Sequence, residues 1–315
     1  MAALSEQDLI AGIRFRAGSH SKSILTFGIG DDCAVLKPRP HQDVVVTTDL
    51  SLEKVHFRRD WHPAESVGHR CLARGLSDLA AMGAKPESAF LSLALPKGLT
   101  RTWMDRFLDG LFALAEKSRV PLAGGDTSSS PAGLVIADIV LLGSVRRGRA
   151  LLRSGARPGD VIYVTGALGG SAAELLTLAH RRKPKQARHP HLYPEPRLAT
   201  GQALVRRRLA NAAIDVSDGL STDLAHICDE SRVHAEIDVE ALPIEAGATL
   251  EQALHGGEDY ELLFTADAPV PKSLGGVAIH AIGRIKKRGK GPAVTLLQNG
   301  KRSALLAEGW EHFRS

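Results

Sequence analysis

The chain has 315 residues, of which 43% are hydrophobic and 24% are charged, and its formal net charge is +5. This length predicts about two domains, and the composition is typical of a globular protein, which excludes a disordered or fibrous chain. No apolar run approaches the ~18 residues of a membrane span, and the first residues lack the apolar core of a signal peptide.

The strands and helices predicted in the first half alternate along the chain. The β-branched run at 43–49 predicts a buried strand, and residues 134–143 predict another. Between them, apolar residues at helical spacing predict one helix from about Pro63 to 82 and a second helix over 101–118. The polar, basic segment 145–160 then predicts a domain boundary that ends in an RPGD turn.

The second half continues this mixture of strands and helices. The predicted strands cover 161–166, 212–217, 261–266 and 277–285, and the predicted helices lie near 170–180, near 197–209 and over 220–230. We therefore expect two domains of α/β or α+β class, residues 1–146 and residues 147–315.

Cysteine usage bears on the compartment. Cys33, Cys71 and Cys228 stand far apart in the sequence and form no CxxC pair. This pattern argues against a disulfide scaffold or a zinc knuckle and favours a reducing environment. We therefore expect a cytoplasmic protein with no membrane partner.

Carboxylates recur in short segments flanked by Gly, Ser or Thr, which we expect at strand ends and turns. Taken singly, each of these is most simply a solvated turn, and Asp126 could equally cap a helix. Several carboxylates gathered at one place, however, need cations to neutralise them. The segments are GDDCAV (30–35), TTDLS (47–51), GLSDLAAMG (75–83), AGGDTSSS (123–130), IDVSDGLSTD (214–223) and HGGEDYEL (255–262).

The ligand chemistry of these segments favours Mg²⁺ and phosphate. Hard oxygen ligands suit Mg²⁺, which carboxylates commonly share with substrate phosphates, and no HExxH motif or Cys/His cluster predicts zinc. Glycine beside a carboxylate lets backbone N–H groups approach phosphate oxygens. No P-loop, GxGxxG or GxSxG motif is present.

The ordered set of motifs resembles the thiamine-monophosphate kinase family, of the superfamily that includes aminoimidazole ribonucleotide synthetase. The resemblance implies that ATP and thiamine monophosphate react to give ADP and thiamine diphosphate, with several Mg²⁺ ions. It also implies an N-terminal α/β domain that pairs in a homodimer with a barrel-like centre, and a C-terminal α+β domain. The motifs run from GIGDDCAV through TTD, VHF, LSDLAAMGA, GGDT, GRALLRSGARPGD, YPEPR, IDVSDGLSTDL and GGEDYEL to GWEHF.

The resemblance also assigns roles to individual residues. Asp31 would orient its loop. No general base is expected, because a phosphate monoester has a second pKa near ~6 and therefore arrives as a nucleophilic dianion. We expect direct in-line transfer. The implied Mg²⁺ ligands are Asp32, Thr47, Thr48, Asp49, Asp78, Asp126, Asp215 and Asp218; Gly125, Asp126, Arg153 and Ser217 would contact ATP; His56, Glu258 and Trp310 would line the thiamine monophosphate pocket.

Some assignments have structural alternatives. Arg153 could be a surface cation of the linker, Trp310 could fill a core, and His56 could be a packed imidazole. The chain also departs from the family pattern at two positions: Lys54 precedes VHF, where a small residue is usual, and Gly75 precedes LSDLAAMG, where Asn is usual.

Two related enzymes and a nucleic-acid-binding protein are the alternatives to a kinase. Selenophosphate synthetases carry a reactive Cys near a Lys before the position of Gly28, and a related carbamoyl dehydratase ends in a cysteine-bearing tail; this chain has neither feature. The basic runs at 180–189, 206–208 and 286–290 would suit a nucleic-acid-binding protein. Aromatic residues are only 4% and are not interleaved with these runs, so solvated surfaces explain them better, and we expect no nucleic-acid partner.

Overall fold

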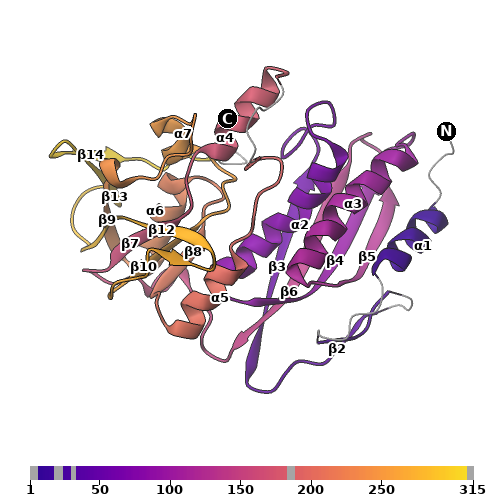
Figure 1. Cartoon of the computed structure of the whole chain (residues 1–315), viewed down its shortest axis with the longest axis horizontal. Coiled ribbons are helices and arrows are strands. Elements are labelled where there is room, and N and C mark those ends of the chain that lie inside the picture. Colours follow the sequence, from indigo (N-terminus) through magenta and orange to yellow (C-terminus); the bar gives the residue numbers. More distant parts are fainter. Residues whose placement is uncertain (1–5, 18–23, 30–32, 183–188, 311–315) are drawn as a thin grey trace. The chain divides into compact units, whose positions relative to one another are not determined.

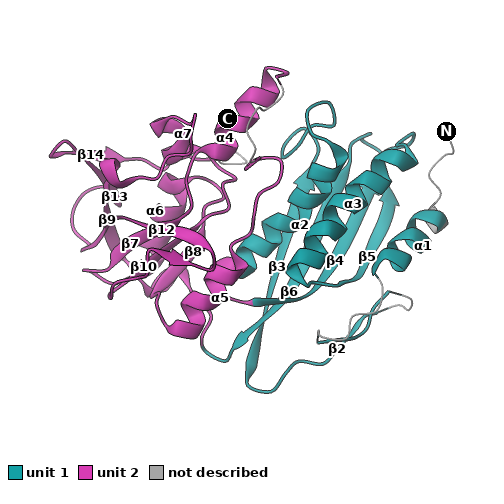
Figure 2. Cartoon of the chain, in the orientation of Figure 1, with its two compact units in different colours: residues 1–79, 85–148 teal, residues 80–84, 149–315 magenta. Residues whose placement is uncertain are grey.

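The computed structural model describes residues 6–17, 24–29, 33–182 and 189–310. The chain forms two compact units, one of residues 1–79 and 85–148 (unit 1) and one of residues 80–84 and 149–315 (unit 2), coloured separately in Figure 2. The predicted boundary after residue 146, and the roles given to the two domains, stay predictions. Within the described residues, no helix is both long and apolar enough to cross a membrane.

Unit 1 is a four-stranded sheet with two long helices on one face (Figure 1). The strand order is β3-β6-β4-β5, and only the β4–β5 pair is parallel. The strands are β3 (Gln42–Leu52), β4 (Lys85–Leu95), β5 (Leu122–Ser129) and β6 (Ile136–Arg146); the helices are α2 (Ala64–Ala81) and α3 (Arg101–Ser118), and unit 1 also has α1 (Glu6–Ala17) and the ribbon of β1 (Leu25–Phe27) with β2 (Val35–Leu36).

Side chains alternate between the two faces of this sheet. On β6, Ala137, Ile139 and Leu141 are fully buried, whereas the residues between them are partly exposed. Because strand side chains have a period of two, the odd-numbered residues of β6 face the helices. The opposite face, which we call the open face, carries the exposed Val44 and Val46 on β3.

Glycines set the close crossing of α2 and α3. A Cβ at Gly68 would lie 1.8 Å from the carbonyl oxygen of Phe107, and a Cβ at Gly110 would lie 1.8 Å from that of Glu65. Only glycine fits at both positions. Thr100 caps the start of α3 by accepting a hydrogen bond from Trp103 N at 3.2 Å.

Unit 2 is built on one large mixed sheet of order β14-β13-β9-β12-β7-β10-β8, with β11 paired to β12. The β13–β9 pair is parallel and the other pairs are antiparallel. Its strands are β7 (Val161–Thr165), β8 (Ala212–Asp215), β9 (Val233–Asp238), β10 (Leu262–Ala266), β11 (Ser273–Leu274), β12 (Val277–Lys287), β13 (Val294–Gln298) and β14 (Lys301–Leu305); its helices are α4 (Gly170–Ala179), α5 (Leu198–Arg207), α6 (Leu220–Ser231) and α7 (Leu250–His255), with 3₁₀ turns η1 (Arg153–Gly155) and η2 (Val239–Ala241).

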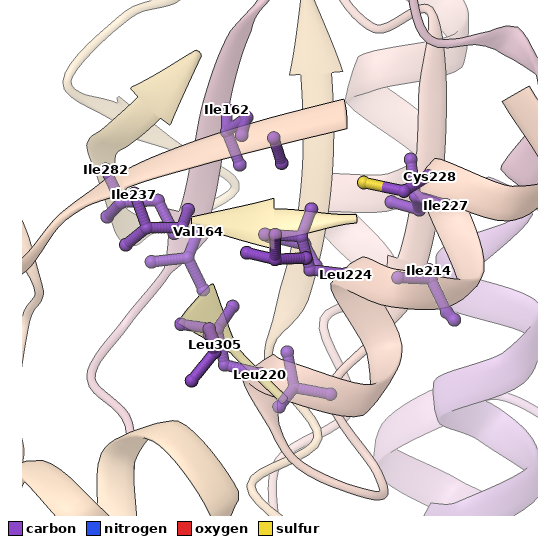
Figure 3. Close-up of a cluster of buried hydrophobic side chains, with 14 of the residues drawn as sticks. Ile162, Val164, Ile214, Leu220, Leu224, Ile227, Cys228, Ile237, Ile282 and Leu305 are labelled. Atoms are coloured by element: carbon purple, nitrogen blue, oxygen red, sulfur yellow. The ribbon is translucent and has the colours of Figure 1, made fainter. Parts of the chain in front are cut away.

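The central strands of unit 2 are buried on both faces. Ile162 and Val164 of β7 join a cluster with Leu224 and Ile227 of α6, shown in Figure 3, while Tyr163 belongs to a second cluster that includes residues of α5. Burial on both sides explains why residues 161–164 form an uninterrupted apolar run, which Thr165 ends.

Most of the predicted elements are confirmed. The strands predicted at 43–49, 134–143 and 161–166 are β3, β6 and β7, and the helices predicted at 101–118 and 220–230 are α3 and α6. Two expectations are wrong. The GGDT segment is not a loop, because Asp126 lies inside β5, and TTD lies inside β3 rather than at its end.

The class of the two domains, mixed α/β, is confirmed. The sheet of unit 1 and the sheet of unit 2 are both open in the described residues, and neither closes into a barrel. The basic run 206–208 lies at the C-terminal end of α5, where positive charge is favourable to the helix dipole, which gives it a structural explanation.

Candidate active site

Three side chains of β3 pair with three side chains of α2 on the helix-facing side of the unit 1 sheet. Thr47 Oγ1 donates to the Asp78 carboxylate, Arg74 lies 2.7 Å from Asp49, and Ser51 bonds to Cys71. We call these contacts the β3–α2 pairs. They bring three of the predicted metal ligands, Thr47, Asp49 and Asp78, to one interface.

Cys71 is an inert member of this group. Burial and the charge of Asp49 raise the pKa of its thiol to about 12, although Arg74 and Ser51 act in the opposite direction. Because the thiolate is the nucleophilic form, a pKa that high keeps Cys71 unreactive at neutral pH.

Other predicted ligands lie on the open face. Thr48 Oγ1 donates to Asp138 Oδ1 at 3.0 Å. Ser92 of β4 stands opposite Asp126 of β5 on one side and opposite Asp138 of β6 on the other, so the three side chains form a row across neighbouring strands. The structure therefore divides the predicted ligands of unit 1 between the two faces of its sheet.

A cavity of about 850 Å³ lies in unit 1, beside the GGD motif. Gly125 and Asp126 line it, together with Arg14 of α1 and the residues Ile29 and Cys33, which flank the GDD segment. Its volume lies within the range of roughly 300–1,000 Å³ that is usual for small-molecule sites. Asp31 and Asp32 themselves lie outside the described residues.

Gly125 is required by the sheet as well as by the cavity. Its φ is +153°, and a Cβ would lie 1.8 Å from the carbonyl oxygen of Leu91. Beside it, the Asp126 carboxylate accepts a hydrogen bond from Thr127 N at 2.8 Å and is exposed. An exposed carboxylate next to a glycine backbone, at the wall of a cavity that also holds an arginine, suits a phosphate–metal pair.

In unit 2, three of the predicted motifs meet. The backbone N–H of Glu258, in GGED, donates to the carbonyl of Ser217, in DVSDG, at 2.7 Å. The N–H of Trp310, in GWEHF, donates to the carbonyl of Asp218 at 3.0 Å. The predicted substrate residues Glu258 and Trp310 thus lie against the turn that carries Asp215 and Asp218.

Negative charge is concentrated at this turn. The Asp223 carboxylate accepts hydrogen bonds from the backbone N–H groups of Ser217, Asp218 and Gly219 at 3.0–3.1 Å. Burial first, and then the charges of Asp215 and Asp218, nevertheless raise its pKa well above the ordinary value. A bound cation would relieve this repulsion.

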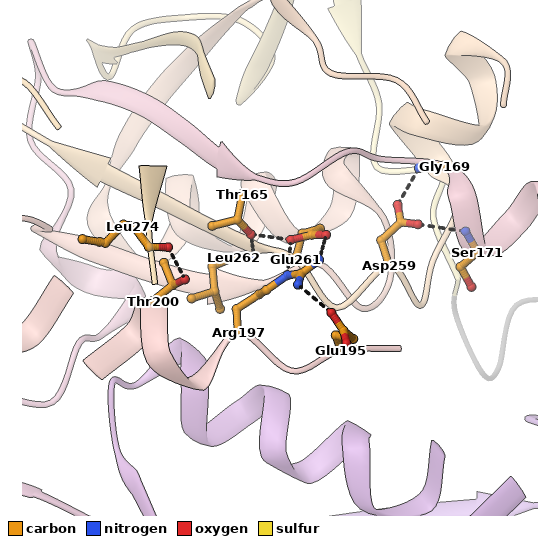
Figure 4. Close-up of polar contacts among 10 residues, drawn as sticks. All are labelled: Thr165, Gly169, Ser171, Glu195, Arg197, Thr200, Asp259, Glu261, Leu262 and Leu274. Atoms are coloured by element: carbon orange, nitrogen blue, oxygen red, sulfur yellow. Dashed lines mark hydrogen bonds and ion pairs between the residues drawn. The ribbon is translucent and has the colours of Figure 1, made fainter. Parts of the chain in front are cut away.

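The motifs YPEPR and GGEDYEL are joined by a buried ion pair, shown in Figure 4. Arg197 binds the Glu261 carboxylate in a bidentate manner, with Nε at 2.7 Å from Oε2, and Thr165 Oγ1 donates to the same carboxylate at 2.6 Å. Both partners are at least nine-tenths buried. Removing one partner of such a pair commonly costs about 3–5 kcal/mol, so Arg197 and Glu261 within these motifs are explained by the fold.

Three other predicted site residues, Trp310, His56 and Arg153, differ in their surroundings. Trp310 is 54% exposed, which excludes a core-filling role. His56 Nδ1 accepts a hydrogen bond from Leu52 N at 3.0 Å, which ties the imidazole to its own turn. Arg153 is exposed beside the start of β8 and the end of α6, and the structure does not bring it to Ser217.

Of the two departures from the family pattern, Gly75 has a local explanation and Lys54 has none. Lys54 adopts φ +74°, a left-handed conformation that a glycine accepts more easily. A Cβ at Gly75 would lie 2.6 Å from Leu141 Cδ1, so glycine permits close packing of α2 on β6.

Sequence reasoning missed two residues near the candidate site. Asp138 is a lone carboxylate in an otherwise apolar strand, and this contrast was a usable signal. Arg14 reaches the cavity only through the packing of α1, which no motif indicates.

One group of possible metal ligands lies close together in unit 2. Within the described ranges, Glu251, His255 and Glu308 are the only three acidic, His or Cys side chains whose ligand atoms lie within 4.8 Å of one another. None of the three is a predicted Mg²⁺ ligand.

Two family models match the two halves of the chain. The family model for the AIR synthase related protein, N-terminal domain, matches residues 30–145, and that for the C-terminal domain matches residues 157–291. The thiamine-monophosphate kinase of Salmonella typhimurium is 42% identical over 90% of this chain and 88% of its own length. The chain belongs to the thiamine-monophosphate kinase family.

Solved structures of this family share the fold. The thiamine-monophosphate kinase from Stenotrophomonas maltophilia superposes with a TM-score of 0.79 at 37% identity, over 95% of this chain and 98% of that one. The structure of AaThiL complexed with AMPPCP and TMP superposes with a TM-score of 0.75 at 32% identity, over 98% and 97% of the two chains.

Proposed function

We propose that this chain is an ATP-dependent kinase that phosphorylates thiamine monophosphate to thiamine diphosphate. The observation that carries the proposal is the lining of the unit 1 cavity by Gly125 and Asp126, the GGD pair, in a chain whose relatives are named thiamine-monophosphate kinase. The complex of AaThiL with AMPPCP and TMP supports the same pair of substrates. The cavity would take the nucleotide, with Arg14 and the backbone at Gly125 facing its phosphates.

The donor atoms fit Mg²⁺, because they are carboxylate and hydroxyl oxygens. The ions would be held by Thr47, Thr48, Asp49, Asp78 and Asp126 in unit 1, by Asp215 and Asp218 in unit 2, and by Asp32, which lies outside the described residues. When bound, Mg²⁺ would neutralise phosphate charge and orient the transferring group.

The residues of the chain would bind and orient two anions rather than move a proton. The phosphate of thiamine monophosphate is mostly a dianion at neutral pH, since its second pKa is about 6. It needs no general base, so the main tasks are to offset repulsion and to align donor and acceptor for direct in-line transfer. In unit 2, Glu258 and Trp310 would hold the organic part of the substrate, and Ser217 would face the nucleotide.

The open face of unit 1 supports a homodimer. Val44, Val46 and Leu50 of β3 are 41–63% exposed on this face, beside Val140 and Leu142 of β6. Pairing with a second copy would bury them and give the barrel-like centre that the family resemblance implies. Light scattering should give twice the mass of 33.6 kDa for the wild type and the monomer mass for Val46→Lys.

A coupled assay of ADP release tests the activity. Purified protein with Mg²⁺ and ATP should release ADP with thiamine monophosphate, and not with thiamine, which lacks the acceptor phosphate. Equal release with unrelated phosphate monoesters, or none with thiamine monophosphate, would contradict the proposal. In-line transfer predicts inversion at an isotopically labelled γ-phosphorus, and retention would contradict it.

A further inference from the structure

The backbone around Glu258 is strained. Glu258 has φ +65° and Tyr260 has φ +51°, in the left-handed region that side-chain-bearing residues rarely adopt. Such conformations persist only where the surroundings hold them, and they gather at functional sites. Neither residue is a glycine, so the loop keeps side chains at these positions despite the strain.

Buried contacts on both sides hold this loop. The Asp259 carboxylate accepts from Gly169 N at 2.6 Å and from Ser171 N at 3.0 Å, at the start of α4 (Figure 4). Tyr260 N donates to Val216 O at 2.9 Å. Glu258, between these anchors, keeps a side chain that is 22% exposed.

His191 connects the same helix to the Glu258 carboxylate. Its Nδ1 lies 2.9 Å from Ser171 Oγ and 3.5 Å from Glu258 Oε2. The imidazole is 1% exposed, and its backbone N–H donates to Glu174 Oε2 at 2.8 Å. A fixed imidazole thus stands behind a carboxylate that reaches the surface.

We propose that His191 is a positioning residue, which sets the direction of the Glu258 carboxylate toward the cationic thiazolium ring of thiamine monophosphate. The inference rests on the proposed function. Ser171 fixes the ring through Nδ1, and Asp259 fixes Ser171, so the strained loop and α4 act as one support. Without the imidazole, the Glu258 side chain would sample several rotamers. Ordering it on binding would then weaken the affinity for thiamine monophosphate.

Kinetics with varied thiamine monophosphate test this role. His191→Ala should raise the KM for thiamine monophosphate about tenfold and leave kcat within about twofold, because orientation of one charged contact is lost in ground state and transition state alike. His191→Asn, whose amide can replace Nδ1, should restore most of the affinity. His189→Ala is the matched control, since His189 bonds to the same Glu174 at 2.7 Å and is more exposed, and it should leave KM unchanged.

A double mutant separates positioning from general damage. If His191 acts through Glu258, then Glu258→Ala/His191→Ala should bind no worse than Glu258→Ala. Additive losses, or an unchanged KM in His191→Ala, would overturn the inference. Should His191→Ala fail to fold, Ser171→Ala must show the same rise in KM, and normal values there would overturn the inference too.

Calorimetric titration of thiamine monophosphate, with a non-hydrolysable ATP analogue present, distinguishes the two proposals. Absence of binding to the wild type would overturn the proposed function and the inference with it. Binding to the wild type that His191→Ala leaves unchanged would overturn the inference alone.

Discussion

The guanidinium of Arg74 lies 2.7 Å from the carboxylate of Asp49, a predicted Mg²⁺ ligand. The chain therefore supplies its own cation at a position where a metal ion is expected. Each side chain is less than one-fifth exposed, so the pair is stronger than a surface ion pair.

Replacing Arg74 by Gln should tighten Mg²⁺ binding, because the metal no longer competes with the guanidinium for Asp49. We expect the Mg²⁺ concentration for half-maximal binding to fall several-fold, and the metal-free protein to lose about 1–3 kcal/mol of stability. Thermal unfolding across a Mg²⁺ series measures both effects. Arg106→Gln, which breaks the exposed pair with Glu65, is the control and should change neither. A weaker Mg²⁺ response in Arg74→Gln would contradict this account.

Replacing Asp126 by Asn should lower kcat by about two to three orders of magnitude, since the exposed carboxylate would serve the metal and the phosphate rather than the fold. Steady-state assays at saturating Mg²⁺ and ATP measure the loss, and circular dichroism should show an unchanged melting temperature. Asp229→Asn, at the exposed end of α6, should behave like the wild type. Near-normal turnover by Asp126→Asn would remove Asp126 from the site.

Asp259 predicts a pH dependence of stability. Burial raises its pKa from 3.8 to about 7, although the N–H groups of Gly169 and Ser171 oppose the shift. Between these values the folded protein holds a proton that the unfolded chain has released, so the free energy of unfolding should fall as pH rises from about 4 to about 7. Urea unfolding at several pH values should show this slope in the wild type. In Asp259→Asn the slope should be smaller by the Asp259 contribution; an equal slope would contradict the assignment.

The space around Gly110, at the α2–α3 crossing, and around Gly12, in α1, predicts opposite effects for the two Gly→Ala changes. Gly110→Ala should destabilise unit 1 by about 1–3 kcal/mol or more, because the new methyl group would overlap the Glu65 carbonyl. Gly12→Ala lies in α1 with open space around it and should stabilise by about 0.5–1 kcal/mol. Chemical denaturation of both variants measures the difference. Stabilisation by Gly110→Ala would contradict this prediction, because it would show that α2 and α3 can move apart without loss of stability.

Much of the fold could be predicted because its periodicity is strong. The helix over 101–118 has both an apolar face and a Thr cap, and the strand at 161–165 is apolar up to Thr165. By contrast, β4 begins with Lys85 and Pro86, and the middle of β5 is Gly124, Gly125 and Asp126, residue types with little strand propensity. Residues 122–129 form a strand because Gly124 and Gly125 fit closely against β4, which is a tertiary effect.

The sequence predicted which residues belong to the candidate site, but only partly where those residues lie in the fold. The motifs DVSDG, GGED and GWEHF indicated residues that meet in unit 2 through backbone hydrogen bonds. The division of Thr47 and Thr48 between opposite faces of β3 follows from the strand period and the strand predicted at 43–49, but the partners on each face, Asp78 and Asp138, became known only from the structure. The buried support of Glu258 by His191 joins residues 67 positions apart, with no local signal for it.

The β3–α2 pairs limit where the chain can gain or lose residues during evolution. Along β3 the three residues lie two positions apart, at Thr47, Asp49 and Ser51. Their partners on α2 run in the opposite direction and lie about one helical turn apart, at Asp78, Arg74 and Cys71. Deleting one residue of β3 before Thr47 would turn all three side chains toward the opposite face at once. Length variation among natural relatives should therefore be confined to the flanking connections, leaving this strand–helix spacing invariant.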